Sequence, residues 1–552
     1  MFSTMQDEPL SLAHLLDHAG EAYHASTMST WTGTETRRAT YADLVGRAAR
    51  VANALVSLGV GRFDRVATFM WNNNEHMEIY TAVPAMGAVL HALNIRLSAG
   101  QLTFIANHAE DHVVFVDGSL LATLEAVLPQ MRTVRHVVVV NGDASSFAAP
   151  PGVAVHDYEE LLAAQAATYD FPVLDERAPA AMCYTSGTTG DPKGVVYSHR
   201  SLYLHALQVT TPSGFGISTA DSCLAIVPMF HVNSWSLPFA ALVSGASLLL
   251  PDQYLQAEPL LAFMAAERPT RAAAVPAVWN GILTQLERHP QDISHLRTAV
   301  VGGAAVPPAL MEAFEERHGV TIVQAWGMTE TSSLGTVAYA PAGIDADAAM
   351  AYRVTQGQFP SLVRHRLVDE DGHTVPHDGI SLGEVQVRGP WVTGSYYSPQ
   401  GPVAEPGSFD DGWLRTGDVG RITRDGYLTL VDRAKDIIKS GGEWISSVEM
   451  ENDVMAHPDV VEAAVFAVPD PRWDERPCVA VVLREGVTPD PEGLRAHLAR
   501  RWARWQLPAQ WTFVAEVPKT SVGKFDKKVL RSRHADGRLD IVHTQGIQVA
   551  DR

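Results

Sequence analysis

The segment YTSGTTGDPKG, residues 184–194, determines how the rest of this chain is interpreted. It follows a short apolar run, residues 181–184, and holds three glycines, four Ser/Thr hydroxyls and one lysine. Glycines allow backbone N–H groups to crowd around an anion, hydroxyls donate to phosphate oxygens, and lysine neutralises charge. Because these residue types follow a predicted strand in this order, we interpret the segment as a phosphate-holding loop rather than a flexible surface loop.

Two other phosphate-binding motifs fit this segment worse. A Walker A motif needs a second glycine five residues after the first and then a lysine, but from Gly187 that position is Pro192. The dinucleotide-binding pattern G-x-G-x-x-G does not follow a strand here either. Neither a P-loop NTPase nor a dinucleotide-binding fold is therefore favoured.

Patterns typical of helices and of buried strands alternate through much of the chain, as they do in an α/β fold. Apolar residues recur at helical spacing over residues 41–58, and Gly59 then favours a stop. The apolar runs that predict buried strands are residues 66–70, 113–116, 137–140, 181–184, 299–301 and 321–323.

After about residue 353 the pattern changes to short strands separated by Asp-Gly turns, which predicts a small β-rich subdomain. These predicted strands are residues 364–368, 383–388 and 427–431. The polar segment DRAKD, residues 432–436, is a predicted hinge. The tail returns to mixed patterns, with strands predicted at 464–468 and 479–483 and a helix at 491–505.

These patterns predict an α/β fold with two domains. The large N-terminal domain, residues 1–434, would contain two α/β subdomains plus the small β-rich subdomain. A small, mobile α+β C-terminal domain, residues 435–552, would follow. A length of 552 residues agrees with this division, because one hydrophobic core rarely serves so long a chain.

Composition and charge indicate a globular protein and argue against nucleic-acid binding. Of all residues, 46% are hydrophobic and 19% are charged, which is typical of a globular protein. The formal net charge is −20, whereas a nucleic-acid-binding protein is expected to present a basic surface, so we predict no nucleic-acid partner. Any anionic ligand must then be held by local charges and backbone N–H groups.

The cysteines and the apolar segments predict neither disulfides nor membrane insertion. Cys183, Cys223 and Cys478 lie far apart without metal-ligand spacing, and their odd number argues against a disulfide framework. Cys183 lies in an apolar run, which favours packing over chemistry. The N-terminal MFSTMQDEPL lacks a signal-peptide pattern, and the longest apolar tract, residues 238–250, is too short to span a bilayer. We therefore predict a cytoplasmic protein without a transmembrane segment.

The phosphate loop and the motifs that follow it along the chain resemble those of the adenylate-forming superfamily. This superfamily comprises acyl-CoA synthetases, peptide-synthetase adenylation domains and firefly-type luciferases. The resemblance extends from about Tyr41 to Arg531, with the core motifs in order. It implies an enzyme that uses ATP and Mg²⁺ to convert a carboxylic acid to its acyl-adenylate. A homodimer through the large domain is a further family-level expectation.

By this resemblance, two further segments surround the nucleotide. In QAWGMTET, residues 324–331, Trp326 would face adenine, Thr329 would contact the α-phosphate and Glu330 would coordinate Mg²⁺, a hard cation that prefers oxygen ligands. In VGGAAVP, residues 301–307, small residues would form one wall of the adenine site. The implied ATP-binding residues of this part are Thr185, Ser186, Gly187, Thr188, Thr189, Gly190, Lys193, Gly303, Ala304, Ala305, Gln324, Ala325, Trp326, Gly327, Met328 and Thr329, and the implied metal ligands are Thr185 and Glu330.

Further implied ATP-binding residues lie in the second half of the chain. In LRTGDVG, residues 414–420, Asp418 would accept hydrogen bonds from the ribose, since a carboxylate is a natural acceptor for a vicinal diol. Arg433 would approach the ribose and phosphate from the hinge, and Lys435 would lie at its pivot.

The segment PKTSVGKFDKK, residues 518–528, contains the implied catalytic lysine, Lys524. Its ammonium would bridge the substrate carboxylate and the α-phosphate and stabilise charge as pyrophosphate leaves. The glycine before Lys524 predicts a mobile loop. Lys527 and Lys528 are interpreted as solvated.

The hinge segment DRAKDIIKSGGEWISS, residues 432–447, resembles the version in fatty-acyl-CoA synthetases. In that family the small domain rotates after adenylation and exchanges its Lys524 face for the face of residues 439–444. Lys439 is also an implied catalytic and ATP-binding residue, and core packing is an open alternative for Trp444. The implied residues that bind coenzyme A (CoA) are Lys439, Ser440, Gly441, Gly442 and Trp444.

The segment PMFHVNSW, residues 228–235, is implied to contact the acyl group. His231, an implied catalytic residue, would lie near the acyl carboxylate and the entering thiol, and Trp235 matches a position that gates the acyl tunnel. No acidic residue stands here to bind an amino group, and the apolar neighbours favour a hydrophobic acyl group. The implied acyl-binding residues are His231, Val232, Trp235, Val278, Gly303 and Gly327.

We therefore predict an ATP-dependent acyl-CoA synthetase for a hydrophobic carboxylic acid. The resemblance to the family favours medium- or long-chain fatty acids. A branched, aromatic or polycyclic apolar acid would leave the same motifs. The alternative is an adenylating enzyme that passes the acyl group to a carrier protein or a partner enzyme. A non-catalytic nucleotide-binding protein is disfavoured by the intact motifs, and a hydrolase by the expected absence of a G-x-S-x-G nucleophile elbow.

Overall fold

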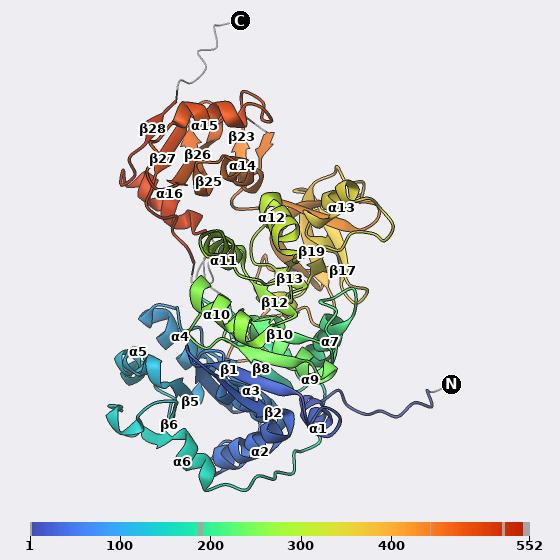
Figure 1. Ribbon diagram of the computed structural model, residues 1–552, viewed down its shortest axis with the longest axis vertical. Coiled ribbons are helices and arrows are strands. Elements are labelled where there is room, and N and C mark those ends of the chain that lie inside the picture. Colours follow the sequence, from blue (N-terminus) through green and yellow to red (C-terminus); the bar gives the residue numbers. More distant parts are fainter. Residues whose placement is uncertain (1–2, 186–190, 442, 521–524, 545–552) are drawn as a thin grey trace, which may run out of the picture. The chain divides into compact units, whose positions relative to one another are not determined.

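The computed structural model (Figure 1) describes residues 3–185, 191–441, 443–520 and 525–544. Its internal contacts divide the chain into two compact units. The large unit comprises residues 1–306, 310–364 and 387–414, and the small unit comprises residues 307–309, 365–386 and 415–552. Each unit contains sheets and a hydrophobic core of its own.

The first sheet of the large unit has the strand order β7-β6-β5-β3-β4-β8-β9. Neighbouring strands are parallel, except that β8 and β9 form an antiparallel pair. The bounds are β3 (Arg65–Phe69), β4 (Val89–Ala92), β5 (Asp111–Asp117), β6 (His136–Val140), β7 (Ala154–Asp157), β8 (Pro179–Tyr184) and β9 (Gly194–Ser198). Four predicted strands fall on β3, β5, β6 and β8 and are confirmed; their continuous apolar runs are typical of parallel strands covered on both faces.

The second sheet of the large unit has the order β16-β15-β14-β13-β12-β10-β11-β1-β2. Its bounds are β1 (Thr27–Trp31), β2 (Thr36–Thr40), β10 (Ser222–Ala225), β11 (Ser247–Leu250), β12 (Arg271–Ala274), β13 (Thr298–Val301), β14 (Thr321–Trp326), β15 (Thr336–Val337) and β16 (Gly357–Gln358). Strands β10, β12, β13 and β14 are parallel neighbours, so their carboxyl ends meet at one edge. The strands predicted at 299–301 and 321–323 are confirmed as parts of β13 and β14.

Helices connect and cover these sheets. They are α1 (Leu12–Ala22), α2 (Tyr41–Ser57), α3 (Asn74–Ala85), α4 (Ala99–Ala109), α5 (Leu121–Val127), α6 (Tyr158–Ala163), α7 (His199–Thr210), α8 (Val232–Trp235), α9 (Leu237–Ser244), α10 (Ala257–Glu267), α11 (Pro276–Arg288), α12 (Pro308–His318) and α13 (Ala346–Arg353). The helix predicted at 41–58 is α2, which begins with a capping box between Thr40 and Asp43. Its buried residues include Leu44, Val51 and Leu55, as the apolar spacing predicted.

The small unit contains two groups of strands. The first has the order β18-β17-β19-β21-β22, and the second has the order β24-β23-β26-β27-β28, with β25 paired to β26. The bounds are β17 (Arg364–Val368), β18 (Thr374–Val375), β19 (Gly383–Arg388), β21 (Trp413–Ile422), β22 (Tyr427–Arg433), β23 (Ile438–Ser440), β24 (Glu443–Ile445), β25 (Val460–Asp470), β26 (Asp474–Leu483), β27 (Gln510–Phe513) and β28 (Val542–His543). Its helices are α14 (Ser447–Met455), α15 (Pro491–Leu498) and α16 (Lys527–Ala535). The predicted α/β class, the β-rich segment and the α+β tail are confirmed.

The helix predicted at 491–505 is shorter in the structure, because α15 ends at Leu498. The chain then turns so that the indole N–H of Trp502 donates to Asp453 on α14 at 2.6 Å. Trp502 and Trp505 both pack against the core of the small unit. Tertiary packing of these two aromatic side chains therefore replaces the last turns of the predicted helix.

Lys527 is buried, which shows that its interpretation as a solvated lysine was wrong. Its ammonium lies 2.8 Å from a carboxylate oxygen of Glu451 on α14 and also donates to the hydroxyl of Ser447. The cause is its place as the first residue of α16, which packs against β25. Asp432 accepts a hydrogen bond from the N–H of Ser447 at 2.7 Å, so this buried network reaches the hinge segment. Lys528 is exposed, as predicted.

The three cysteines are buried and free, which confirms the interpretation of Cys183 as a packing residue. Burial raises the pKa of the Cys183, Cys223 and Cys478 thiols to about 12. Because the thiolate is the reactive form of cysteine, these side chains are unreactive at neutral pH.

In the described part of the chain, every helix is too short or too polar to span a lipid bilayer.

Buried histidines predict that acid weakens the large unit. Burial lowers the pKa of His76 and His199 to about 4 and that of His205 to about 3. These values lie below the ordinary pKa near 6.5, so the unfolded state binds more protons than the folded state. The contribution of these neutral histidines to the stability of the folded state is complete above about pH 6.5, and it is lost as the pH falls towards their folded pKa values. Between pH 7.5 and 5.5, each histidine should account for a loss of about 1.4 kcal/mol.

His205→Gln tests this prediction. The free energy of unfolding of the large unit is measured in urea at both pH values, and the variant should lose about 1.4 kcal/mol less than the wild type. The readout is the difference between His205→Gln and the wild type in how much the free energy of unfolding changes with pH, because other buried groups titrate in the same range. The exposed His24 provides the control, since His24→Gln should respond to pH as the wild type does. Equal responses of His205→Gln and the wild type would contradict the prediction.

Candidate active site

The described ends of the phosphate-loop segment form the end of an antiparallel hairpin. Thr185 follows β8 and Lys193 precedes β9, and the Thr185 N–H donates to the Lys193 carbonyl at 2.9 Å. The Lys193 N–H donates in return to Oγ1 of Thr185 at 3.1 Å. The Lys193 ammonium pairs with Glu405 and lies 4.9 Å from the centre of the Tyr396 ring. The hairpin therefore fixes both ends of the segment and places its lysine beside an aromatic face.

Some predicted site residues lie outside the described residues, and their roles remain predictions. They are Ser186, Gly187, Thr188, Thr189, Gly190, Gly442 and Lys524.

Four other predicted segments meet at one edge of the second sheet. His231 follows β10, Val278 follows β12, Gly303 follows β13 and Thr329 follows β14. The four strands are parallel neighbours, and the carboxyl edge of such strands is the usual ligand-binding edge of an α/β sheet. The fold therefore brings together, at one edge of the sheet, the implied acyl-binding and adenine-binding segments, which lie between residues 231 and 329 of the sequence.

Trp235 lies against the glycine-rich turn that follows β13. A Cβ atom on Gly302 would lie 3.2 Å from Cη2 of Trp235 and 2.9 Å from the Ala325 carbonyl oxygen, so a larger residue would push these groups apart. Gly303 has a φ of +86°, in the left-handed region that favours glycine. The structure thus brings an implied acyl-binding side chain against the implied adenine wall. Ala304 in the same turn is exposed.

The segment that carries Trp235 has an unusual backbone. Residues 232–236 all have φ between +45° and +65°, although none of them is glycine. Each L-residue in this region costs about 1–2 kcal/mol, and strain of this kind persists where the surroundings enforce it and clusters at functional sites. His231, directly before the turn, has an extended φ of −124° and is half-buried. The strain supports the assignment of this segment to the site.

Buried polar side chains hold this turn and the segment directly before it, and the sequence patterns did not single them out. The Asn72 amide donates to carbonyls of residues 225 and 227 at 2.8 and 2.9 Å and accepts from the Met229 N–H at 2.7 Å. The Tyr80 hydroxyl donates to Oδ1 of Asn233 at 2.8 Å. The run of three asparagines at residues 72–74, the last of which begins α3, was the available signal.

Gln324 has a structural role that limits its predicted contact with the nucleotide. It is buried, its Oε1 accepts from the Val306 N–H at 2.7 Å, and its Nε2 donates to the Thr355 carbonyl at 2.7 Å. The side chain is therefore engaged within the large unit. Any contact of this position with a nucleotide would therefore be made by the backbone around Gln324.

The loop after β14 is closely packed. A Cβ atom on Gly327 would lie 1.8 Å from the Ser333 carbonyl oxygen, and one on Gly335 would lie 2.3 Å from Cζ3 of Trp326. The implied adenine-facing Trp326 is therefore held by its own loop, and it is buried together with Thr329. Ala325, Gly327 and Met328 are half-buried.

Glu330 is a buried carboxylate. It is 7% exposed, and its Oε1 accepts a hydrogen bond of 2.9 Å from the Tyr396 hydroxyl. Within the described ranges, that bond is the carboxylate's sole polar contact, so Oε2 has no partner there. A buried charge needs a counter-charge, and Mg²⁺ prefers carboxylate oxygens. Glu330 therefore fits the role of a Mg²⁺ ligand.

In the small unit, Asp418 and Arg433 are cross-strand partners in β21 and β22. Nε of Arg433 lies 2.6 Å from Oδ1 of Asp418, which is buried. A carboxylate can accept from a diol, and the guanidinium beside it can donate to a phosphate. The structure thus joins these two predicted ribose-site residues, while Lys435 is exposed two residues further on.

The predicted CoA segment begins with a hairpin, in which Lys439 of β23 lies opposite Trp444 of β24. The Lys439 ammonium lies 2.9 Å from Oε1 of Glu370, which raises the pKa of Lys439. Ser440 is buried, and Gly441 has a φ of +63°, which favours glycine. Trp444 is half-buried.

One sequence string contradicts the expected absence of a nucleophile elbow. GISLG, residues 379–383, matches G-x-S-x-G. The structure places it in a loop before β19, where Ser381 Oγ donates to Asp378 at 2.9 Å. A nucleophile elbow lies between a strand and a helix, whereas this string leads into a strand, so it does not form a hydrolase site.

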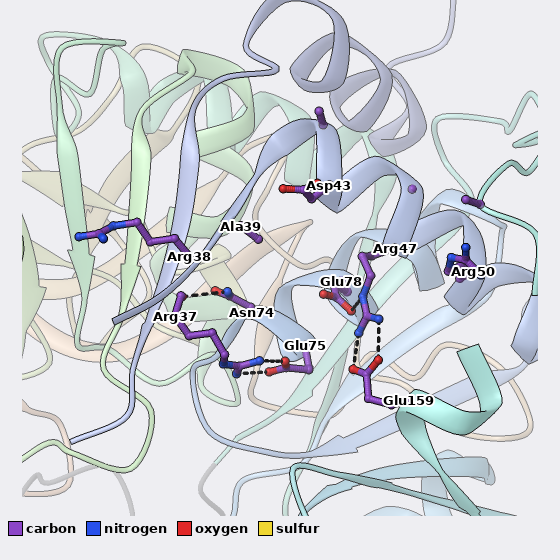
Figure 2. A pocket seen from close by; sticks show the side chains of 13 residues that line it. Arg37, Arg38, Ala39, Asp43, Arg47, Arg50, Asn74, Glu75, Glu78 and Glu159 are labelled. Carbon is purple, nitrogen blue, oxygen red and sulfur yellow. Dashed lines mark hydrogen bonds and ion pairs between the residues drawn. The ribbon is translucent and has the colours of Figure 1, made fainter. Parts of the chain in front are cut away.

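A separate pocket of about 530 Å³ lies between β2, α2 and α3 (Figure 2), and none of the predicted site residues lines it. Arg37 pairs with Glu75 through both carboxylate oxygens, and Arg47 pairs with Glu159 and with Glu78 at 2.9 Å. Burial raises the pKa of Glu78 to about 7. Because its charged groups neutralise one another, this pocket is not assigned to the anionic nucleotide.

Comparison with known proteins agrees with this geometry. The chain matches the family model described as AMP-binding enzyme over residues 16–397 and the model described as AMP-binding enzyme C-terminal domain over residues 449–524.

Curated relatives span almost the whole chain. The 3-methylmercaptopropionyl-CoA ligase of Ruegeria pomeroyi is 42% identical and covers 97% of this chain and 99% of its own. The long-chain-fatty-acid–CoA ligase of Thermus thermophilus is 44% identical and covers 96% of this chain and 97% of its own. The solved structure of the anthranilate CoA ligase AuaEII in complex with anthranoyl-AMP has a TM-score of 0.85 at 26% identity and covers 97% and 99% of the two chains. The predicted large α/β part with a small C-terminal part is confirmed by these matches.

Proposed function

Because this chain belongs to the AMP-binding enzyme family, we propose that it is an AMP-forming acid–thiol ligase that uses ATP, Mg²⁺ and CoA. It adenylates a hydrophobic carboxylic acid and then transfers the acyl group to CoA. The observation that carries this proposal is the buried carboxylate of Glu330, with one oxygen held by Tyr396 and the other without a partner in the described part of the chain. An arrangement of this kind suits a cation bound to phosphate.

In the first half-reaction, a carboxylate oxygen of the acid attacks the α-phosphorus of ATP, and pyrophosphate leaves. Mg²⁺, held by Glu330 and Thr185, would supply charge neutralisation for the phosphates. Lys193 would neutralise further charge from the hairpin, and Asp418 would orient the ribose. Lys524 would stabilise the charge that develops between the acid and the α-phosphate.

In the second half-reaction, the CoA sulfur attacks the carbonyl carbon of the acyl-adenylate. A C–S bond forms, the C–O bond to AMP breaks, and the thiol proton leaves. His231 is proposed to orient the carbonyl and the thiol from the strained turn. The small domain, residues 435–552, is proposed to rotate between the two steps and to present residues 439–444.

The acyl group is proposed to be a medium- or long-chain fatty acyl group. The apolar environment of Val232, Trp235 and Val278 supports a hydrophobic acid. The names of the two relatives range from a 3-methylmercaptopropionyl to a long-chain-fatty-acyl group, so chain length is the property to be measured.

Carboxylate-dependent ATP–pyrophosphate exchange over a panel of acids tests this proposal. Medium- and long-chain fatty acids should exceed acetate and amino acids by at least about tenfold, because added methylenes in an apolar pocket increase discrimination by that order. Exchange with none of the hydrophobic acids would disprove adenylation of this class. Release of AMP should also require free CoA; release that depends instead on a carrier protein would favour the alternative acceptor.

Two further properties are proposed from the sequence and the family. A homodimer through the large domain would be detected by light scattering of the purified protein. A cytoplasmic location would be detected by cell fractionation.

A further inference from the structure

Tyr396 contacts two residues of the proposed nucleotide-phosphate site. Its hydroxyl lies 2.9 Å from Oε1 of Glu330, the proposed Mg²⁺ ligand. The face of its ring lies under the Lys193 ammonium, at 4.9 Å from the ring centre. All three residues belong to the large unit, and Tyr396 is 8% exposed.

The surrounding chain fixes the orientation of the Tyr396 side chain. Its backbone N–H and carbonyl both bond to Val403, at 2.9 and 2.8 Å, and its ring packs against that of Phe409, with centroids 5.5 Å apart. The hydroxyl donates its hydrogen bond to Oε1 of Glu330.

The same segment also holds the backbone around Glu330. The Thr393 N–H donates to the Glu330 carbonyl at 2.8 Å. The Trp391 indole donates to the Leu334 carbonyl at 3.0 Å, and the Trp391 carbonyl accepts from the Ser332 hydroxyl at 2.9 Å. With both its backbone and one carboxylate oxygen fixed, Glu330 keeps Oε2 in one direction.

We propose that Tyr396 is a positioning residue for metal-dependent ATP binding, which orients Glu330 through its hydroxyl and Lys193 through its ring. The proposal rests on the proposed function, because it needs Glu330 as a Mg²⁺ ligand. A partner that orients a metal ligand typically changes metal affinity by about 10–100-fold when it is removed. A cation over an aromatic face adds a separate, metal-independent contribution.

Calorimetric titration of ATP, with Mn²⁺ or with EDTA and without any acid substrate, separates these two contributions. The readout is the gain in ATP affinity that Mn²⁺ produces, which does not depend on turnover. Tyr396→Phe removes only the hydroxyl, so it should reduce this gain by about tenfold and leave metal-free ATP binding unchanged. Tyr396→Leu also removes the ring, so it should weaken metal-free ATP binding as well.

Two further variants decide whether the effect passes through Glu330. In a Glu330→Gln background, Tyr396→Phe should have no additional effect on the Mn²⁺-dependent gain, whereas general structural damage would add to it. The matched control is Tyr397→Phe, which should retain the full gain. Thermal unfolding checks the fold of each protein. If Tyr396→Phe does not fold, Tyr396→His replaces it, because the histidine ring N–H can still donate to Glu330. Tyr396→His should then retain more of the Mn²⁺-dependent gain than Tyr396→Leu.

An unchanged gain in Tyr396→Phe, together with a clear gain in the wild type, would overturn the positioning role and leave the proposed function intact. Equal gains in Tyr396→His and Tyr396→Leu would overturn it in the same way. A wild type without any Mn²⁺-dependent gain, or without acid-dependent exchange, would instead refute the metal or the adenylation part of the proposed function.

Discussion

Lys524→Ala should reduce acid-dependent ATP–pyrophosphate exchange by about 10²–10³-fold, the range observed when one group that stabilises a developing charge is removed. The same variant should form the acyl-CoA from supplied acyl-adenylate and CoA at nearly the wild-type rate. The physical reason is that Lys524 is proposed to stabilise displacement at the α-phosphorus, whereas the second step proceeds at the carbonyl carbon, where residues 439–444 are proposed to replace the Lys524 face. Exchange and thioester formation are measured separately on the same preparation.

Lys528→Ala is the matched control, because Lys528 is an exposed lysine in the same segment and should be dispensable for both steps. Lys527 is unsuitable as a control, since its ammonium is buried against Glu451 and its loss would leave a buried carboxylate unpaired. Equal losses in the two half-reactions of Lys524→Ala would contradict the assignment of Lys524 to adenylation alone.

Glu330→Gln should reduce exchange by about 10²–10³-fold at limiting Mg²⁺, because the substitution keeps the shape of the side chain and removes the charge that holds the metal. The concentration of Mg²⁺ that gives half-maximal exchange should rise by at least about tenfold, and saturating Mg²⁺ should restore part of the activity. Exchange is measured over a Mg²⁺ titration at fixed ATP and acid.

The control for this experiment is Glu316→Gln, which alters an exposed carboxylate on α12. This variant should follow the wild-type Mg²⁺ titration. A Glu330→Gln enzyme with reduced activity but an unchanged Mg²⁺ requirement would show that Glu330 acts in some other way than by binding the metal.

The strained turn at residues 232–236 shows why local sequence rules were insufficient at the site. Val232 is a β-branched residue that avoids a positive φ, yet it has a φ of +45°. The conformation is imposed from elsewhere: the Tyr80 hydroxyl on α3 binds Asn233 in the turn, and Asn72 binds residues 225, 227 and 229 directly ahead of it. A departure from local preference of this kind is expected where function requires it.

The sequence by itself determined the α/β class, the position of the predicted strands and the family. These properties depend on short-range patterns: apolar runs for buried strands, and the fixed order of Gly, hydroxyl and Lys residues for the phosphate loop. Such patterns can be recognised without coordinates, because each concerns residues that are neighbours in the chain. The same holds for the carboxylate of Glu330, whose chemistry follows from its residue type.

Only the tertiary structure decided which side chains support these residues. The hydroxyl of Tyr396 reaches Glu330 across 66 positions of sequence, and the ammonium of Lys527 reaches Ser447 across 80. Contacts over such distances arise from the packing of whole elements, so neither the positioning role of Tyr396 nor the burial of Lys527 has a local signature. The physical reason is that burial and charge pairing are properties of the folded surroundings, whereas a motif specifies only the group that is placed there.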